Sequence, residues 1–225
     1  NNQGLFQRMD LEELNLPDEV YSIDGIEFYG QISFLKAGLV YSDFVTTVSP
    51  AYARDIQTSG FSGGMEGVAA RYSHKLRGIL SGIDCNTWSC KNNPYLPPSK
   101  NSGRVWKQEN KKALAASFGI HIERPLFVMI GRMTSRKGLE LVSDAAYELA
   151  DKNADFFILG HGDKSYGRIL KKLSESFGNF FIHTKYDFEL VHRLFASADF
   201  LLSPSVYEPF GSSHLIGACY GAVPI

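Results

Sequence analysis

The sequence has few cysteines, no long hydrophobic run and no excess of charge of either sign. Its three cysteines, Cys85, Cys90 and Cys219, are an odd number without CxxC spacing. This pattern favours reduced thiols in a cytosolic protein over a disulfide framework or a metal site. The longest apolar runs reach about six residues, whereas a helix that crosses a membrane needs roughly 20. We therefore expect no membrane partner.

Charge and composition exclude further classes of protein. The 23 basic and 24 acidic residues are dispersed along the chain and give a formal net charge of −1. Without a basic stripe or an acidic tail, nothing indicates a nucleic-acid partner. Hydrophobic residues make up 44% of the chain and aromatic residues 13%, which excludes a disordered chain and allows a sizeable core. The composition is typical of a soluble intracellular protein.

Apolar segments alternate with helical patterns, most clearly in the second half of the chain. Strands are predicted over 43–48, 77–80, 126–130, 156–159, 179–183 and 199–203, and helices over 34–41, 50–57, 105–118, 164–177 and 187–197. A further helix is predicted after the strand at 126–130, with apolar positions that recur from Leu139 to Leu149. Strands alternating with helices of this length predict an α/β protein with a parallel, doubly wound sheet. The chain begins without methionine and ends in a segment, 221–225, that is typical of the start of a strand. We therefore expect an internal piece of a longer protein.

The motif GRMTSRKG at 131–138 lies where the strand predicted at 126–130 turns into a helix. Arg132 and Lys137 bracket this turn, with Thr134 or Ser135 as the expected N-cap of the helix. Either cation alone is more often a solvated charge. Together, beside the positive end of a helix, they predict a phosphate site that requires no metal. We expect both side chains to be exposed.

A second motif, SVYEPFGSSH at 205–214, follows the strand predicted at 199–203. It offers the carboxylate of Glu208 and then two small residues, Ser212 and Ser213, whose backbone N–H groups can approach an anion. Both motifs lie at strand ends, where open α/β sheets bind ligands. A phosphate site and a carboxylate in one crevice indicate group transfer from a nucleotide-linked donor.

Seven ordered motifs, which together span most of the chain, resemble the bacterial glycogen synthases and plastid starch synthases. They are GQISFLKAGLVYSD (30–43), TTVSPAYARDI (46–56), GMEG (64–67), GILSGID (78–84), GRMTSRKGLELV (131–142), LGHGD (159–163) and SVYEPFG (205–211). The opening Asn2-Gln3-Gly4 also resembles the end of a family motif. The resemblance implies a retaining glycosyltransferase of the GT-B fold, with two Rossmann-like domains of doubly wound parallel sheet. It implies the end of the first domain at 1–88, a boundary loop at 89–104 and most of the second domain at 105–225.

The resemblance also implies roles for individual residues. Arg132 and Lys137 are similar to the pair that binds the donor diphosphate, and Glu208 to the active-site glutamate near the transferred sugar. The remaining substrate-binding residues implied or considered are Tyr186, which packs on adenine in the family, Gly211, Ser212 and Ser213 at the distal phosphate, Ser81 at the donor sugar, and His161 in its glycine turn. Ser81 and Phe210 depart from the family, which has asparagine and cysteine at these positions.

The implied reaction transfers glucose from ADP-glucose to the non-reducing end of an α-1,4-glucan, with no cofactor and no metal. The implied compartment is the bacterial cytoplasm, or the plastid stroma if the source is a plant or alga. Two alternatives stay open: another GT-B transferase that uses a UDP-sugar, and a non-catalytic homologue that binds glucan. Because a GT-B active site lies between two domains, we expect no glucan synthesis from residues 1–225 alone.

Overall fold

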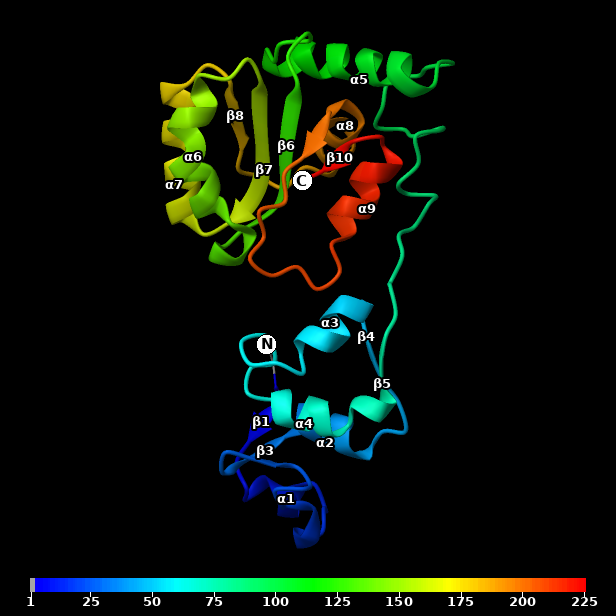
Figure 1. Cartoon of the computed structure of the whole chain (residues 1–225), viewed down its shortest axis with the longest axis vertical. Helices are drawn as coiled ribbons and strands as arrows, with labels where there is room; N and C mark the ends of the chain where they lie inside the picture. The colour runs from blue at the N-terminus through cyan, green and yellow to red at the C-terminus, as the bar shows by residue number, and fades with distance from the viewer. Residues whose placement is uncertain (1–2) are drawn as a thin grey trace. The chain divides into compact units, whose positions relative to one another are not determined.

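The computed structural model describes residues 3–225, which form two compact units (Figure 1). The first unit ends at Ser81 and the second consists of Gly82–Ile225. Each unit has hydrophobic core clusters of its own. Asn2 of the Asn2-Gln3-Gly4 motif lies outside the described residues, whereas the Gln3 side-chain amide donates a hydrogen bond of 2.6 Å to the Gly63 carbonyl.

The first unit contains short elements in two small sheets. Its elements are β1 (Leu5–Phe6), α1 (Asp10–Glu13), the 3₁₀ helix η1 (Asp18–Val20), β2 (Glu27–Phe28), β3 (Gln31–Ser33), α2 (Phe34–Tyr41), β4 (Val45–Thr47), α3 (Pro50–Asp55), α4 (Glu66–Arg71), η2 (Ser73–Lys75) and β5 (Leu76–Gly78). Strands β1, β3 and β2 form an antiparallel sheet, and β4 pairs with β5 in parallel. The sequence predicted both strands of the parallel pair and the helices α2 and α3, but not the antiparallel sheet.

Helix α3 begins where the sequence predicts, and the reason is local. The Ser49 side chain accepts a hydrogen bond from the Tyr52 N–H at 3.0 Å, and Pro50 occupies the start of the helix, where its missing N–H costs nothing. A Cβ atom on Gly78 would lie 2.3 Å from the Ser49 carbonyl oxygen. Glycine at 78 therefore lets β5 approach this helix start closely.

The second unit is built on one five-stranded parallel sheet in the order β10-β9-β6-β7-β8. Its elements are α5 (Gly103–Phe118), β6 (Leu126–Met133), η3 (Ser135–Lys137), α6 (Leu139–Ala150), β7 (Asp155–Gly162), α7 (Lys164–Ser176), β8 (Phe180–His183), α8 (Phe188–Ser197), β9 (Phe200–Leu201), α9 (Ser212–Cys219) and β10 (Val223–Pro224). Among residues 3–225, no helix is long and apolar enough to cross a membrane.

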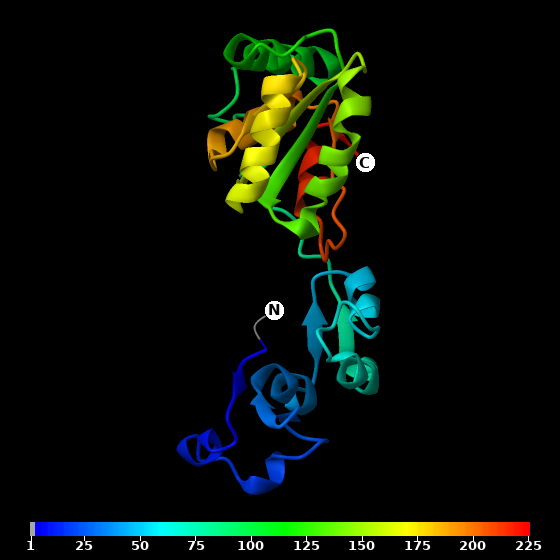
Figure 2. The ribbon, with the colours of Figure 1, turned by 90° about the vertical axis from the view of Figure 1, so that its left-hand side faces the viewer.

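Alternating side chains of the central strands bury both faces of this sheet. On β7, Phe157 and Leu159 belong to the core beneath α5, α8 and α9, whereas Phe156 and Ile158 belong to the core beneath α6 and α7. Such alternation follows from the two-residue period of a strand. Helices cover the two faces in both views (Figures 1 and 2), so the predicted doubly wound parallel sheet is confirmed.

The segment before α5 packs onto the second unit. The Trp88 ring stacks on the buried His192 ring with 4.5 Å between centroids, and the Asn93 amide donates to the Tyr220 hydroxyl at 3.0 Å. The sequence predicted a first domain that extends to residue 88 and a boundary loop at 89–104. In the structure, residues from Gly82 onward already belong to the second unit, because Ile83 and Trp88 pack against its core.

Candidate functional site

The two motif loops meet at the topological switch point of the sheet. Strand β6 pairs with β7 on one side and with β9 on the other. After β6 the chain continues to β7, and after β9 it continues to β10 on the opposite side, so the switch point lies between β6 and β9. Open α/β sheets form a ligand crevice at such a point, outside the carboxyl ends of the strands. The Val206 N–H donates to the Arg136 carbonyl at 3.0 Å, which ties the loop after β9 to the loop after β6.

Gly138 permits the close approach of these loops. Its backbone is left-handed (φ +67°), and a Cβ atom there would lie only 1.9 Å from the Pro204 carbonyl oxygen. A side chain at position 138 would therefore strain the backbone and push the loop after β9 away. This is the position in the motif where glycine is required for two separate reasons.

The predicted N-cap of the helix is wrong. Thr134 precedes the short 3₁₀ helix η3, and its side chain makes no capping hydrogen bond. Ser135 begins that 3₁₀ helix, and α6 starts only at Leu139, with Gly138 at its N-cap position. The extra turn arises because the left-handed Gly138 separates η3 from α6. Lys137 consequently lies in η3, before the start of α6.

Lys137 and Glu208 form an ion pair across the crevice. The Lys137 Nζ atom contacts the Glu208 Oε2 atom, and the two side chains are 27% and 26% exposed. The stem of Lys137 passes over Gly131, where a Cβ atom would lie 3.7 Å from the Lys137 Cε atom. The prediction that both cations are exposed is confirmed for Arg132 and wrong for Lys137, which the Glu208 carboxylate holds in the crevice.

The surroundings of Glu208 keep its carboxylate charged. Partial burial by itself raises the Glu208 pKa, but the hydrogen bond and charge of Lys137, the Ser205 hydroxyl and the charge of His214 outweigh it, so the pKa lies below its ordinary value. The Ser205 hydroxyl donates to Glu208 Oε2 at 3.2 Å.

Sequence reasoning missed two of these partners, Ser205 and His214. Ser205 could have been found from its place three residues before Glu208, a spacing at which a serine side chain commonly bonds within a turn. His214 carries no comparable signal. It reaches the site because Gly211 turns the chain with a left-handed backbone (φ +73°), and a Cβ atom on Gly211 would lie 2.7 Å from His214 Nδ1.

Arg132, His161 and Tyr186 lie on the same side of the sheet. Arg132 on β6 is in register with His161 on β7, and strand alternation directs both toward the face that α8 and α9 cover. The Tyr186 ring meets the His161 ring edge-on with 5.8 Å between centroids, and Tyr186 is 60% exposed. The structure therefore brings together two residues that the sequence had considered separately.

The remaining predicted residues divide between the two units. Gly211 is the N-cap of α9, and Ser212 and Ser213 form the beginning of its first turn. The first N–H groups of a helix have no acceptor within the helix and carry its positive dipole end, as the predicted phosphate contact requires. Ser81 is the exposed last residue of the first unit, so the cluster in the second unit forms without it.

Comparisons with known proteins match both units of the chain. Residues 1–71 match the starch synthase catalytic domain, and residues 110–225, more than half of the chain, match the glycosyl transferases group 1. This chain belongs to the glycogen and starch synthase family of glycosyltransferases. The resemblance identified from the sequence motifs is confirmed.

Individual relatives agree with this assignment. A glycogen synthase of Thermodesulfovibrio yellowstonii is 38% identical over 227 residues, which cover 99% of this chain and 46% of the relative. The catalytic domain of starch synthase IV from Arabidopsis thaliana, bound to ADP and acarbose, superposes with a TM-score of 0.87 at 29% identity, over 99% of this chain and 48% of that one.

A sucrose-phosphate synthase from Thermosynechococcus elongatus shares the fold alone. It superposes with a TM-score of 0.57 at 20% identity, over 84% of this chain and 41% of that one. The superposition on starch synthase IV confirms the predicted GT-B fold. The chain spans about half the length of the glycogen and starch synthases it matches.

Proposed function

We propose that the whole protein transfers glucose from ADP-glucose to the non-reducing end of an α-1,4-glucan with retention of configuration. The observation that carries this proposal is the Lys137–Glu208 ion pair at the switch point of the sheet, in a chain of the glycogen and starch synthase family. The related starch synthase IV structure is bound to ADP and to acarbose, which supports a nucleotide diphosphate on the donor side and a glucan on the acceptor side.

In this proposal, positive charge at the crevice stabilises the departing diphosphate. Arg132, Lys137 and the first N–H groups of α9, at Ser212 and Ser213, neutralise negative charge as it develops on the phosphates. Such preorganised groups typically contribute several kcal/mol to lowering a barrier. Glu208 is charged and pairs with Lys137. It orients the sugar or stabilises positive charge at the anomeric carbon, and we assign it no role as a covalent nucleophile.

Three further residues complete the donor site in this proposal. Tyr186 offers an exposed ring for the adenine, and its edge contact with His161 fixes the orientation of that ring. Ser81 contacts the donor sugar in place of the asparagine of the family. Because the chain spans about half the length of its relatives, we also infer that residues 1–225 alone do not extend glucan. A cytoplasmic location stays a prediction.

Donor and acceptor assays with the whole protein test the proposed function. Labelled glucose from ADP-glucose should enter glycogen, UDP-glucose should be the poorer donor, and the new linkage should be α by NMR. A clear preference for UDP-glucose would favour the rival transferase. Binding of glucan without transfer from either donor would favour the non-catalytic homologue. Either outcome contradicts the proposal.

Activity is expected to survive EDTA. Within residues 3–225, no group of three or more His, Cys, Asp or Glu side chains could hold a metal ion, and in our proposal Arg132 and Lys137 supply the charge that Mg²⁺ supplies at other diphosphate sites. Initial rates with and without EDTA should agree. Complete loss of activity that Mg²⁺ restores would show that the phosphate site has been misread.

The acid limb of the pH–rate profile should depend on Ser205. Because the Glu208 pKa lies below its ordinary value, the carboxylate stays ionised as the pH falls, until the pH reaches that lowered pKa. Ser205→Ala removes one hydrogen bond that lowers the pKa, so the acid limb of kcat/KM should move to higher pH. Ser203→Ala, which changes a half-buried serine of the same segment, serves as the matched control and should leave the limb in place. An unshifted limb in Ser205→Ala would contradict the assignment.

A further inference from the structure

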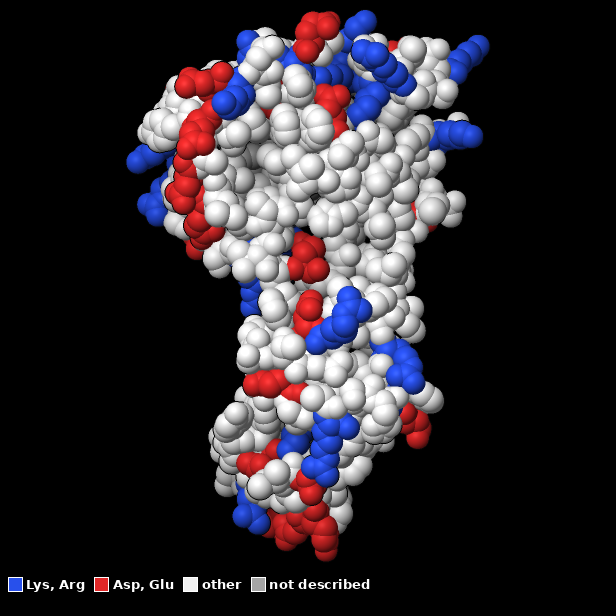
Figure 3. Space-filling model, in the orientation of Figure 1, with Lys and Arg blue, Asp and Glu red and all other residues white. Residues whose placement is uncertain are grey.

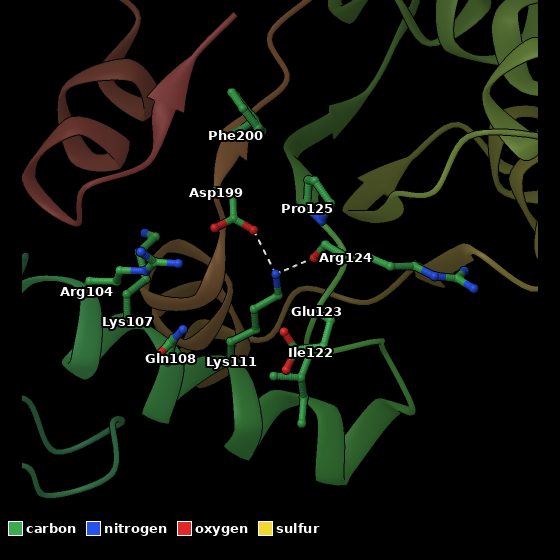
Figure 4. Close-up of a pocket in the computed structure, with 10 residues that line it drawn as sticks. All are labelled: Arg104, Lys107, Gln108, Lys111, Ile122, Glu123, Arg124, Pro125, Asp199 and Phe200. Carbon is green, nitrogen blue, oxygen red and sulfur yellow. Dashed lines mark hydrogen bonds and ion pairs between the residues drawn. The ribbon is translucent and has the colours of Figure 1, made fainter.

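The second unit has another pocket at the amino ends of its strands β6 and β9, opposite the carboxyl ends where the two motif loops meet. It has a volume of about 380 Å³. Helix α5, the segment that leads into β6, and Asp199 and Phe200 at the start of β9 surround it (Figure 4). The switch-point crevice lies at the other ends of the same strands, so the two sites are separate within this unit.

One face of α5 supplies three cations to this pocket. Arg104, Lys107, Gln108 and Lys111 line it, at spacings that place side chains on one face of a helix. Figure 4 shows these side chains extending from α5 toward Asp199, and basic residues gather over the same helix on the surface (Figure 3). A solvated helix face would leave such charges exposed, but here Lys111 is buried and Lys107 half-buried.

The charge of Lys111 is fully compensated within the protein. Its Nζ atom lies 2.8 Å from Asp199 Oδ2 and contacts the Arg124 carbonyl, and its side chain is 8% exposed. Asp199 Oδ2 also accepts a hydrogen bond of 2.8 Å from the Leu126 N–H. The Arg124 guanidinium points away from the pocket toward Asp155, 3.6 Å from its Oδ1 atom (Figure 4).

Lys107 and Arg104, in contrast, form no ion pair with any residue in the described part of the chain. Among the residues that the structure describes, the Lys107 ammonium donates to one acceptor, the Tyr220 carbonyl, at 2.9 Å. Burial lowers the Lys107 pKa to about 8, the charges of Asp199 and Cys90 raise it only in part, and the charge of Lys111 lowers it further. Arg104 is exposed and, within residues 3–225, forms no ion pair. Glu123 is exposed, so solvent and salt screen its charge.

We propose that this pocket binds a small anion such as the phosphoryl group of a phosphate ester, held between Arg104 and Lys107. The anion supplies the acceptors that these two cations lack, and charge-assisted hydrogen bonds of this kind are among the strongest in proteins. The volume lies within the range of small-molecule pockets, which leaves room for an organic group attached to the phosphate.

Equilibrium dialysis of the whole protein with labelled inorganic phosphate tests this site. The Lys137→Ala protein serves as the background, because it weakens the phosphate site at the switch point. Saturable binding of one phosphate per chain is expected. Adding Arg104→Gln should weaken that binding by about tenfold or more, the scale for losing one charged hydrogen bond. Adding Lys112→Gln, which changes an exposed lysine of α5 outside the pocket, should not.

Two further measurements separate the site from general attraction to positive charge. Phosphate binding should weaken as the pH rises from about 7 to 9, because Lys107 then loses its proton, and Lys107→Gln should remove this dependence. Circular dichroism should show that each variant is folded, since Arg104→Gln changes only an exposed side chain. Equal binding by Arg104→Gln and Lys112→Gln, or no saturable binding in the Lys137→Ala background, would overturn the proposal.

Discussion

Replacing Lys137 by alanine in the whole protein should lower kcat by about 10²–10³-fold, the cost of removing one preorganised group from a charged transition state. The substitution removes a cation from the proposed diphosphate site. It also removes the partner ion of the Glu208 carboxylate, whose side chain is only 26% exposed. The unpaired carboxylate would then repel the phosphates of the donor. Steady-state kinetics with ADP-glucose and glycogen measure the change. Arg132→Ala should act in the same direction through the diphosphate alone.

Two comparisons make this result specific. Lys152→Ala removes an exposed lysine that follows the far end of α6, and its kcat should match that of the parent. In the double variant Lys137→Ala with Glu208→Gln, the two losses should not add, because side chains in direct contact act as one unit. Near-normal turnover in Lys137→Ala, or simple additivity in the double variant, would contradict the proposed pair.

The sequence was sufficient to predict the parallel sheet of the second unit and the position of the two motif loops after its strands β6 and β9. Apolar strands such as 126–130 and 156–159 alternate with helical patterns, and this alternation has few solutions other than a parallel, doubly wound sheet. A ligand loop at the carboxyl end of a strand then follows from the architecture. The three-stranded antiparallel sheet of the first unit was not predicted, because strands of two or three residues carry no measurable periodicity.

The contact between Lys137 and Glu208 could not be predicted, because it joins positions 71 residues apart. It depends on β6 lying beside β9. Strand order is a property of the whole sheet, and a local sequence pattern does not determine it. The helix start was misplaced for a related reason. Thr134 and Ser135 are good N-cap residues, but the contact of Gly138 with Pro204 imposes a left-handed backbone that delays the helix.

Replacing Gly138 by alanine should destabilise the protein and disable the site together. A left-handed backbone costs a residue other than glycine about 1–3 kcal/mol, and the new Cβ atom would also lie 1.9 Å from the Pro204 carbonyl oxygen. Since that approach is impossible, the loop after β9 must shift and carry Glu208 with it. Chemical denaturation should show that the free energy of unfolding falls by more than the cost of the left-handed backbone alone. The turnover number should fall as well.

Gly119→Ala separates the two contributions to this effect. Gly119 has the same left-handed backbone (φ +76°), but nothing lies within 4 Å of the position of its Cβ atom. Its replacement should therefore lower the free energy of unfolding only by the cost of the left-handed backbone. It should leave kcat unchanged, because the C-cap of α5 lies away from the switch point. The excess loss of stability in Gly138→Ala then measures the contact between the two loops. Equal losses in both variants, with turnover retained in Gly138→Ala, would show that the loops do not need this contact to place Glu208 against Lys137.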